Sequence, residues 1–274
     1  MEQRIIAAIN DSVLEYERSL AEGKWWKQPL AAFAAAGDSR FRLLPEVAAG
    51  DHLLPGGILD NAKTVVCFFI PFDERVAASN ESAGAASPEW ARAYALTNDL
   101  IKYISGQLAV LLGAEGFRAG QIPATHNFDQ QRLASNWSHR HAARIAGLGS
   151  FGRNNMLITA QGCCGRLGSL VTDWEQPAGT TAPVFVEHCL HVQGKGCGLC
   201  RTKCPVNAYG ESSGSGFDRH ACYRRCLENA ALYKNDTRFP GPILADVCGK
   251  CLCGLPCSGR SPALQGSADL FNRE

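Results

Sequence analysis

The chain has 274 residues, enough for one large hydrophobic core or for a core with a smaller satellite domain. Its 27 lysines and arginines nearly balance its 26 aspartates and glutamates, so the composition gives no electrostatic support for a nucleic-acid partner or an acidic membrane surface. The sequence contains no run of about 18 uncharged apolar residues, so we expect no membrane-spanning helix. The charged N-terminal 30 residues also lack the apolar core of a signal peptide, so we expect a cytoplasmic protein without membrane association.

The first half of the chain predicts alternating helices and strands. Apolar residues recur at helical spacing over residues 2–20, and residues 62–72 form a β-branched and aromatic run typical of a buried strand. Cys67 lies within that run, and we interpret it as a small buried hydrophobe. A helix is predicted from Pro88 to near Gly113, followed by a second strand over 117–123. This order favours an α/β layer.

Residues 123–175 contain most of the chemistry-bearing side chains of the first half, among them Asp129. His126, His139 and His141 are candidate catalytic residues, because histidine titrates near neutral pH and can bind or protonate a substrate. The alternative is structural, with the imidazoles bridging buried polar groups. His139 and His141 are two residues apart, which argues against joint ligation of one metal from a regular helix.

A glycine-rich stretch follows, and it predicts a place where the backbone approaches a ligand closely. Gly147, Gly149 and Gly152, with Arg153, are the candidate cofactor-binding residues, because glycine removes the Cβ that would hold a flat or anionic ligand away. The stretch is no dinucleotide fingerprint, since a predicted helix precedes it and a predicted strand follows. Cys163-Cys164 is interpreted as turn packing rather than as a redox pair.

Ten of the thirteen cysteines lie between residues 189 and 257. In a cytosolic chain such clusters indicate metal ligation rather than disulfides. Cys197-x2-Cys200-x3-Cys204-Pro205 matches the last part of the bacterial ferredoxin motif, and Cys189 can supply the ligand missing at Gly194. Further thiols for a second cluster are Cys222, Cys226, Cys248, Cys251, Cys253 and Cys257. We favour two 4Fe-4S clusters over one cluster with zinc and over disulfides.

The segments "AGLGSFGRNNMLIT" and "GRLGSLVTD", followed by this ferredoxin-like part, resemble the epoxyqueuosine reductase and reductive dehalogenase group, in particular its short forms. The resemblance implies an α+β protein with a nitroreductase-like α/β sandwich over residues 1–185. A small ferredoxin-like domain with two 4Fe-4S clusters would follow over residues 186–274.

The resemblance also implies which cysteines bind each cluster. The first implied set is Cys189, Cys197, Cys200 and Cys257, and the second is Cys204, Cys222, Cys248 and Cys251. Each set takes its fourth thiolate from the other motif, as in two-cluster ferredoxins. Cys226 and Cys253 would be spare. Cys253-x3-Cys257 has the usual motif spacing, so the choice of Cys251 over Cys253 stays open.

In function, the resemblance implies an iron-sulfur oxidoreductase that passes electrons to a cofactor or substrate in the first domain. Cobalamin is the candidate cofactor, with a flavin or no cofactor as alternatives. A ferredoxin or flavodoxin would be the redox partner, and a small molecule or corrinoid the ligand. "PATHNF" replaces the acidic substrate motif of epoxyqueuosine reductases, so a tRNA substrate is not implied. The alternative function is an electron carrier or reductive activator of a corrinoid or redox partner protein, with no substrate of its own.

Overall fold

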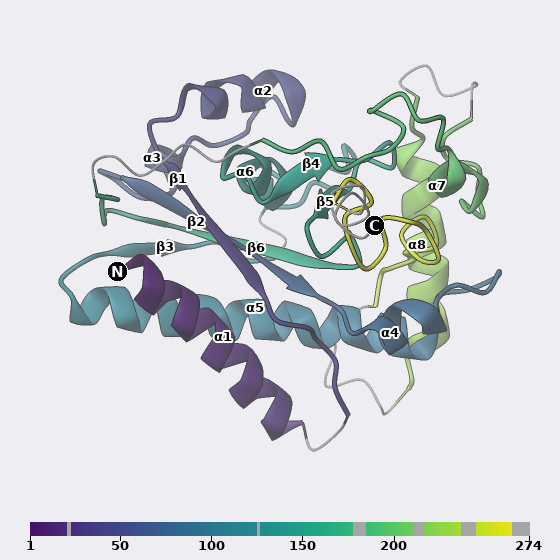
Figure 1. Ribbon diagram of the computed structural model, residues 1–274, viewed down its shortest axis with the longest axis horizontal. Helices are drawn as coiled ribbons and strands as arrows, with labels where there is room; N and C mark the ends of the chain where they lie inside the picture. The colour runs from purple at the N-terminus through teal and green to yellow at the C-terminus, as the bar shows by residue number, and fades with distance from the viewer. Residues whose placement is uncertain (21–22, 125–126, 178–184, 211–215, 237–244, 265–274) are drawn as a thin grey trace, which may run out of the picture. The chain divides into compact units, whose positions relative to one another are not determined.

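The computed structural model describes the whole chain except residues 21–22, 125–126, 178–184, 211–215, 237–244 and 265–274. Helices and strands are mixed, which confirms the α+β class (Figure 1). Two compact units are present, each assembled from separate segments. The first comprises residues 1–70, 98–149 and 165–186, and the second comprises residues 71–97, 150–164 and 187–274. The domain boundary between residues 185 and 186 stays a prediction.

A four-stranded sheet organises the first unit. Its strand order is β1 (Leu30–Ala35), β2 (Thr64–Pro71), β6 (Gly165–Thr172) and β3 (Ala119–Gln121). β1 pairs with β2 and β3 pairs with β6, both antiparallel. All eight residues of β2 are buried, because its continuous apolar run has no polar face to turn toward water. Both strands predicted from sequence, over 62–72 and 117–123, are confirmed.

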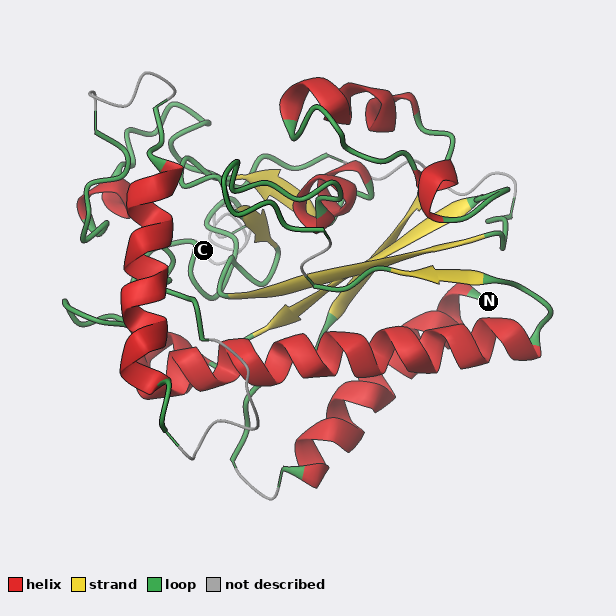
Figure 2. Ribbon diagram, turned by 180° about the vertical axis from the view of Figure 1, so that it is seen from behind, coloured by secondary structure: helices red, strands yellow, loops and turns green. Residues whose placement is uncertain are grey.

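Helices cover both sides of this sheet (Figure 2). α1 (Glu2–Ser19) and α5 (Pro88–Ala114) lie on one side, and the Tyr16 and Tyr103 rings of these helices are 5.8 Å apart. α6 (His139–Ile145) packs on the other side against β1 and β6. Three one-turn helices complete the unit: η1 (Ser39–Leu43), α2 (Leu44–Val47) and α3 (Pro55–Ile58). No helix in the described ranges combines the length and the apolarity that crossing a membrane requires.

Two residues show how closely the first unit is packed. A Cβ atom at Gly168 of β6 would lie 2.3 Å from the Phe68 ring of β2. Only glycine at position 168 therefore leaves room for that ring to pack over β6. Cys67 in β2 is fully buried, and burial raises the pKa of its thiol. This environment confirms the interpretation of Cys67 as a small core residue.

The second unit contains little regular structure. Its described elements are α4 (Glu74–Ser79), the part of α5 up to residue 97, the β-pair of β4 (Gly149–Phe151) with β5 (Leu157–Thr159), α7 (Leu199–Thr202) and α8 (Arg219–Tyr233). α8 begins where the Asp218 carboxylate accepts a hydrogen bond from Ala221 N at 2.9 Å. A small apolar cluster of Ala91, Ala95 and Ala245 is covered by Tyr233 and Val247. Larger apolar side chains of this unit are buried as well, among them Phe72, Trp90 and Leu157.

Candidate metal centre

Four cysteines of the second unit line one cavity: Cys189, Cys197, Cys200 and Cys257. They come from two segments that are far apart in sequence, and they are the members of the first set implied by the resemblance. The cavity has a volume of about 380 Å³, part of it open to solvent. Leucine and proline side chains complete much of its wall, among them Leu190, Leu199, Leu255 and Pro256. Thiols thus face a partly apolar hollow, an arrangement that suits a multinuclear metal group.

Local hydrogen bonds fix the segment that carries Cys189. The Glu187 carboxylate accepts hydrogen bonds from Cys189 N at 2.8 Å and from Ser150 Oγ at 2.7 Å. Ser150 Oγ in turn accepts one from His188 N at 2.7 Å. On the opposite part of the wall, the carbonyl of Cys257 accepts a hydrogen bond from Cys163 N at 2.9 Å. These contacts hold the backbone of two lining cysteines without using their thiols.

The second implied set consists of Cys204, Cys222, Cys248 and Cys251, and donors from the chain point at two of its sulfurs. Ala208 N donates to Cys204 Sγ at 3.3 Å, and the Tyr209 hydroxyl lies 3.7 Å from Cys251 Sγ. Hydrogen bonds of this kind stabilise negative charge on sulfur. The motif itself does not reveal them, because Tyr209 lies 42 residues from Cys251.

The pKa shifts show which thiols are electrostatic neighbours. Burial is the main cause that raises the pKa of Cys251 to about 12; the hydrogen bond from Tyr209 opposes it, and charge on Cys222, Cys248 and Cys204 adds to it. Burial likewise raises the pKa of Cys200, followed by charge on its cavity neighbours Cys257, Cys189 and Cys197. Cys251 and Cys200 therefore each sense the charge of the other three members of their own set. As thiolates the four would repel one another, which a bound cationic metal group would offset.

The remaining cysteines of the second unit contact other thiols. The Cys226 thiol hydrogen-bonds to Cys222, which lowers the pKa of Cys222 to about 7. The fully buried Cys253 hydrogen-bonds to Cys164 and lies 3.6 Å from Asn80 Nδ2, and these surroundings raise its pKa overall. The described residues contain no group of three His, Cys, Asp or Glu side chains arranged to hold a single metal ion. Sequence reasoning identified the thiols, and the structure adds Asn80 and Tyr209 as their polar neighbours.

Cys163 and Cys164 are buried in a tight turn. Their backbone N–H groups both donate to the Ser258 carbonyl, at 3.1 and 3.0 Å, and Cys164 Sγ lies 3.2 Å from the Leu252 carbonyl. Cys163 also hydrogen-bonds to the thiols of Cys164 and Cys257, which raises its pKa. Turn packing describes both residues in this structure, where all thirteen cysteines are free thiols.

In the first unit, both ring nitrogens of His139 have partners within the protein. Nε2 lies 2.9 Å from the Pro123 carbonyl, which can only accept, so Nε2 carries the proton. Nδ1 lies 2.8 Å from Ser169 Oγ, and that oxygen also accepts a hydrogen bond from Trp137 Nε1 at 3.0 Å. His139 is therefore a buried bridge between the Pro123 carbonyl and the Ser169 hydroxyl, which is the structural alternative to a catalytic role.

His141 is neutral at pH 7. Burial, followed by repulsion from the positive charge of Arg140, lowers the pKa of His141 to about 4. Its Nδ1 lies 2.7 Å from Ser138 Oγ, in the residue that caps α6. The third candidate, His126, lies outside the described residues. His52 carries no sequence motif and was missed: its Nδ1 donates to the Leu53 carbonyl at 2.7 Å, and its Nε2 accepts from Ser138 N at 2.9 Å.

The glycine stretch serves two local purposes. Gly147 has a φ of +82° and ends α6, since Leu148 N donates to the Ala143 carbonyl at 3.0 Å. Gly149 begins β4. Gly152 and Arg153, the other two predicted cofactor-binding residues, line the cysteine cavity of the second unit.

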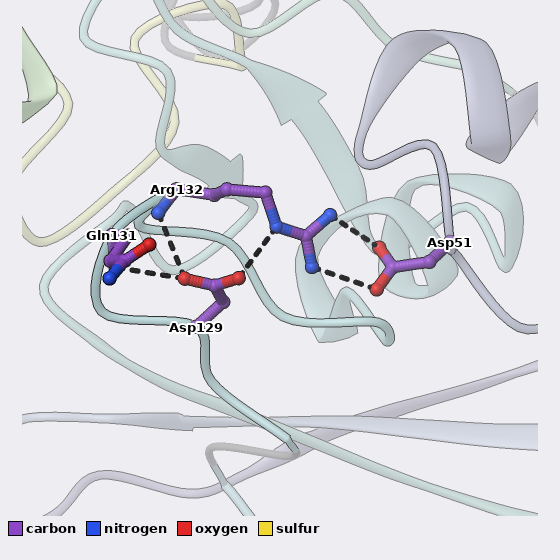
Figure 3. A network of polar contacts seen from close by, with 4 residues as sticks. All are labelled: Asp51, Asp129, Gln131 and Arg132. Atoms are coloured by element: carbon purple, nitrogen blue, oxygen red, sulfur yellow. Dashed lines mark hydrogen bonds and ion pairs between the residues drawn. The ribbon is translucent and has the colours of Figure 1, made fainter.

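Asp129 belongs to an exposed network of polar contacts with Asp51, Gln131 and Arg132 (Figure 3). The Arg132 guanidinium lies between two carboxylates, with Nε 2.7 Å from Asp129 and one terminal nitrogen 2.9 Å from Asp51. Hydrogen bonds from the backbone and side chain of Arg132 and from Gln131 N lower the pKa of Asp129 to about 2. The Asp129 carboxylate is thus ionised at neutral pH, and its oxygens accept hydrogen bonds from Gln131 and Arg132.

No protein-family model matches the chain, and no curated protein sequence matches it. Solved structures do. Epoxyqueuosine reductase from Streptococcus thermophilus superposes with a TM-score of 0.51 at 17% identity, over 89% of this chain and 65% of that one. The Bacillus subtilis enzyme gives 0.51 at 18%, over 92% and 66%. The catabolic reductive dehalogenase NpRdhA gives 0.53 at 15%, over 88% and 31%.

The chain has the epoxyqueuosine reductase fold. At the level of the fold, this confirms the resemblance that was drawn from the glycine and cysteine motifs. The chain spans just under two thirds of the length of these two reductases and about a third of the dehalogenase. Identities of 15–18% concern the fold and leave the chemistry of the site to be argued from this chain's own residues.

Proposed function

We propose that this protein is an iron-sulfur reductase with two 4Fe-4S clusters in its second unit. Cys189, Cys197, Cys200 and Cys257 would hold one cluster, and Cys204, Cys222, Cys248 and Cys251 the other. The observation that carries the proposal is the cavity in which four cysteines from separated motifs meet. The resemblance implies the same four thiols as one ligand set.

The chain's residues have definable tasks in this proposal. Eight thiolates bind iron, and the apolar wall formed by Leu190, Leu255 and Pro256 limits water around the first set. Ala208 N and the Tyr209 hydroxyl hydrogen-bond to sulfurs of the second set. Clusters bound there would supply one-electron transfer at potentials between about −700 and +450 mV.

We assign finer roles to the two units on the same basis. The second unit would be ferredoxin-like, and the first would be the nitroreductase-like part that accepts the electrons on behalf of a substrate or of cobalamin. A ferredoxin or flavodoxin would supply the electrons. Gly152 and Arg153 line the first cysteine cavity, which supports a place beside a cluster for these two residues.

Iron and acid-labile sulfide analysis of the protein purified without oxygen tests the proposal most directly. We expect about eight irons and eight sulfides per chain, with a broad visible absorption that dithionite bleaches. About four of each, or zinc in stoichiometric amount, would contradict it.

One observation favours the alternative function, an electron carrier with no substrate of its own. The ring nitrogens of His139, and Nδ1 of His141, already contact groups of the first unit, so these predicted proton donors are engaged internally. Adding cobalamin to the cluster-loaded protein separates the two functions. A reductase that uses a corrinoid should bind it and change its visible spectrum, whereas a carrier should leave that spectrum unchanged.

A further inference from the structure

Lys250 is a buried lysine inside the second cysteine motif, between Cys248 and Cys251, and its side chain points into the protein. The residue is only 5% exposed. Its Nζ donates to three oxygens: Ser82 O at 2.8 Å, Asn80 Oδ1 at 2.9 Å and Asn80 O at 3.2 Å. An ammonium has three N–H donors, and a neutral amine has two donors and a lone pair. Three acceptors and no donor around Nζ therefore require the charged form.

Asn80 makes this arrangement rigid. Its Oδ1 accepts from Ser87 N at 3.0 Å as well as from Lys250, and its Nδ2 donates to the Cys248 carbonyl at 2.9 Å. Asn80 is fully buried at the end of α4. The same amide thus holds the lysine ammonium and the backbone of a proposed cluster ligand.

Among the described residues, no carboxylate hydrogen-bonds to the Lys250 ammonium. Its three acceptors are neutral oxygens, and Asn80 and Ser82 are the only residues among the described ones that supply them. Burial lowers the pKa of Lys250, and negative charge on Cys248 or Cys253 would oppose that shift. A buried charge is costly without a counter-charge. The chain therefore places an ammonium where an anionic group is needed.

We propose that Lys250 is a positioning residue that raises the reduction potential of the metal cluster held by Cys204, Cys222, Cys248 and Cys251. The inference depends on the proposed function. A cluster gains one electron on reduction, so its reduced form is more negative by one charge and is stabilised more by a nearby ammonium. Screening by solvent is weak at a buried site, so the effect persists at physiological salt.

Redox titration of the cluster-loaded protein, followed by electron paramagnetic resonance of the reduced clusters, tests the inference. Lys250→Met and Lys250→Gln both remove the charge, and glutamine keeps part of the hydrogen bonding. At the wild-type midpoint of the second cluster, the ratio of reduced to oxidised cluster should fall roughly tenfold. That size is expected for a unit charge within about 10 Å at an effective dielectric constant of about 20. The other cluster's midpoint should stay in place.

Lys195→Gln is the matched control, because Lys195 also lies two residues from a proposed ligand, Cys197, but is exposed. Water and salt screen its charge, so we expect little change in either midpoint. Equal midpoints in wild type and both Lys250 variants, with about eight irons in each, would overturn the inference and leave the proposed function intact. Loss of iron from both Lys250 variants would also overturn it, since the lysine would then serve assembly. A wild type without clusters would instead remove the proposed function itself.

Discussion

The histidines of the first unit and the cavity cysteines of the second differ in their surroundings: the histidines have hydrogen-bond partners within the protein, whereas the cysteines line a hollow. His139 uses both ring nitrogens on groups of its own unit, Pro123 and Ser169. The thiols of Cys189 and Cys200 instead line a cavity. A polar group that the chain satisfies by itself requires nothing further, whereas buried thiols grouped around a hollow favour a ligand that completes them. The comparison predicts that substitutions in the two regions change different properties.

Loss of a cavity thiol should have the largest effect. Cys200→Ala removes one of the four lining thiols, so we expect the iron content to fall from about eight to about four per chain and the second unit to unfold at a much lower temperature. Iron analysis and thermal unfolding monitored by circular dichroism measure both.

Cys226→Ala is the control for this loss, because the Cys226 thiol hydrogen-bonds to Cys222 and is absent from both proposed ligand sets. It should retain its clusters and most of its stability. Equal iron content and equal unfolding temperatures for the two variants would refute the ligand assignment.

Backbone geometry in the cysteine motifs gives the next largest effect. Gly249 has a φ of +70°, and a Cβ atom there would lie 2.3 Å from the buried ring of Trp90. Gly249→Ala should lower the free energy of unfolding by about 2–5 kcal/mol, from the left-handed backbone and the steric overlap together. Urea unfolding of the cluster-loaded protein measures this.

Gly194→Ala in the first motif isolates the backbone contribution. Gly194 has a φ of +77°, but no atom lies within 4 Å of a Cβ placed there. Its cost should be about 1–2 kcal/mol. Equal costs for Gly249→Ala and Gly194→Ala would mean that Trp90 moves aside and that the second motif is packed more loosely than the structure indicates.

Sequence reasoning succeeded where the determining pattern is local. The apolar run of β2, the periodicity of α5 and the cysteine spacing each lie within a few dozen residues. It missed β1, whose sequence LAAFAA is rich in alanine, a weak strand former, and is extended because it pairs with β2. It also missed β6, where Gly168 has meaning only beside Phe68. The contacts of Asn80 with the second motif span some 170 residues, and no spacing rule predicts them.

A smaller effect is expected in the histidine region. His139→Gln cannot serve both Ser169 and Pro123 in the same geometry, so it should destabilise the first unit by about 1–3 kcal/mol while the iron content stays constant. His220→Gln, at an exposed position on α8, should change stability by less than about 0.5 kcal/mol. A fall in iron content in His139→Gln, but not in His220→Gln, would contradict the expectation that substitutions in the first unit leave the clusters intact.

The smallest effect concerns protons at His141. Its pKa is lowered to about 4, chiefly by burial, against about 6.5 for an unfolded histidine. The fold therefore favours the neutral ring, and the stability gained is fully present above pH 6.5 and is lost as the pH falls toward 4. Comparing unfolding free energies of wild type and His141→Gln across this range should show a difference that shrinks toward low pH. Nuclear magnetic resonance titration should give a midpoint near 4. A ring with that midpoint is not an imidazolium at neutral pH and is therefore no general acid there. A midpoint near 6.5 would make His141 a candidate proton donor again.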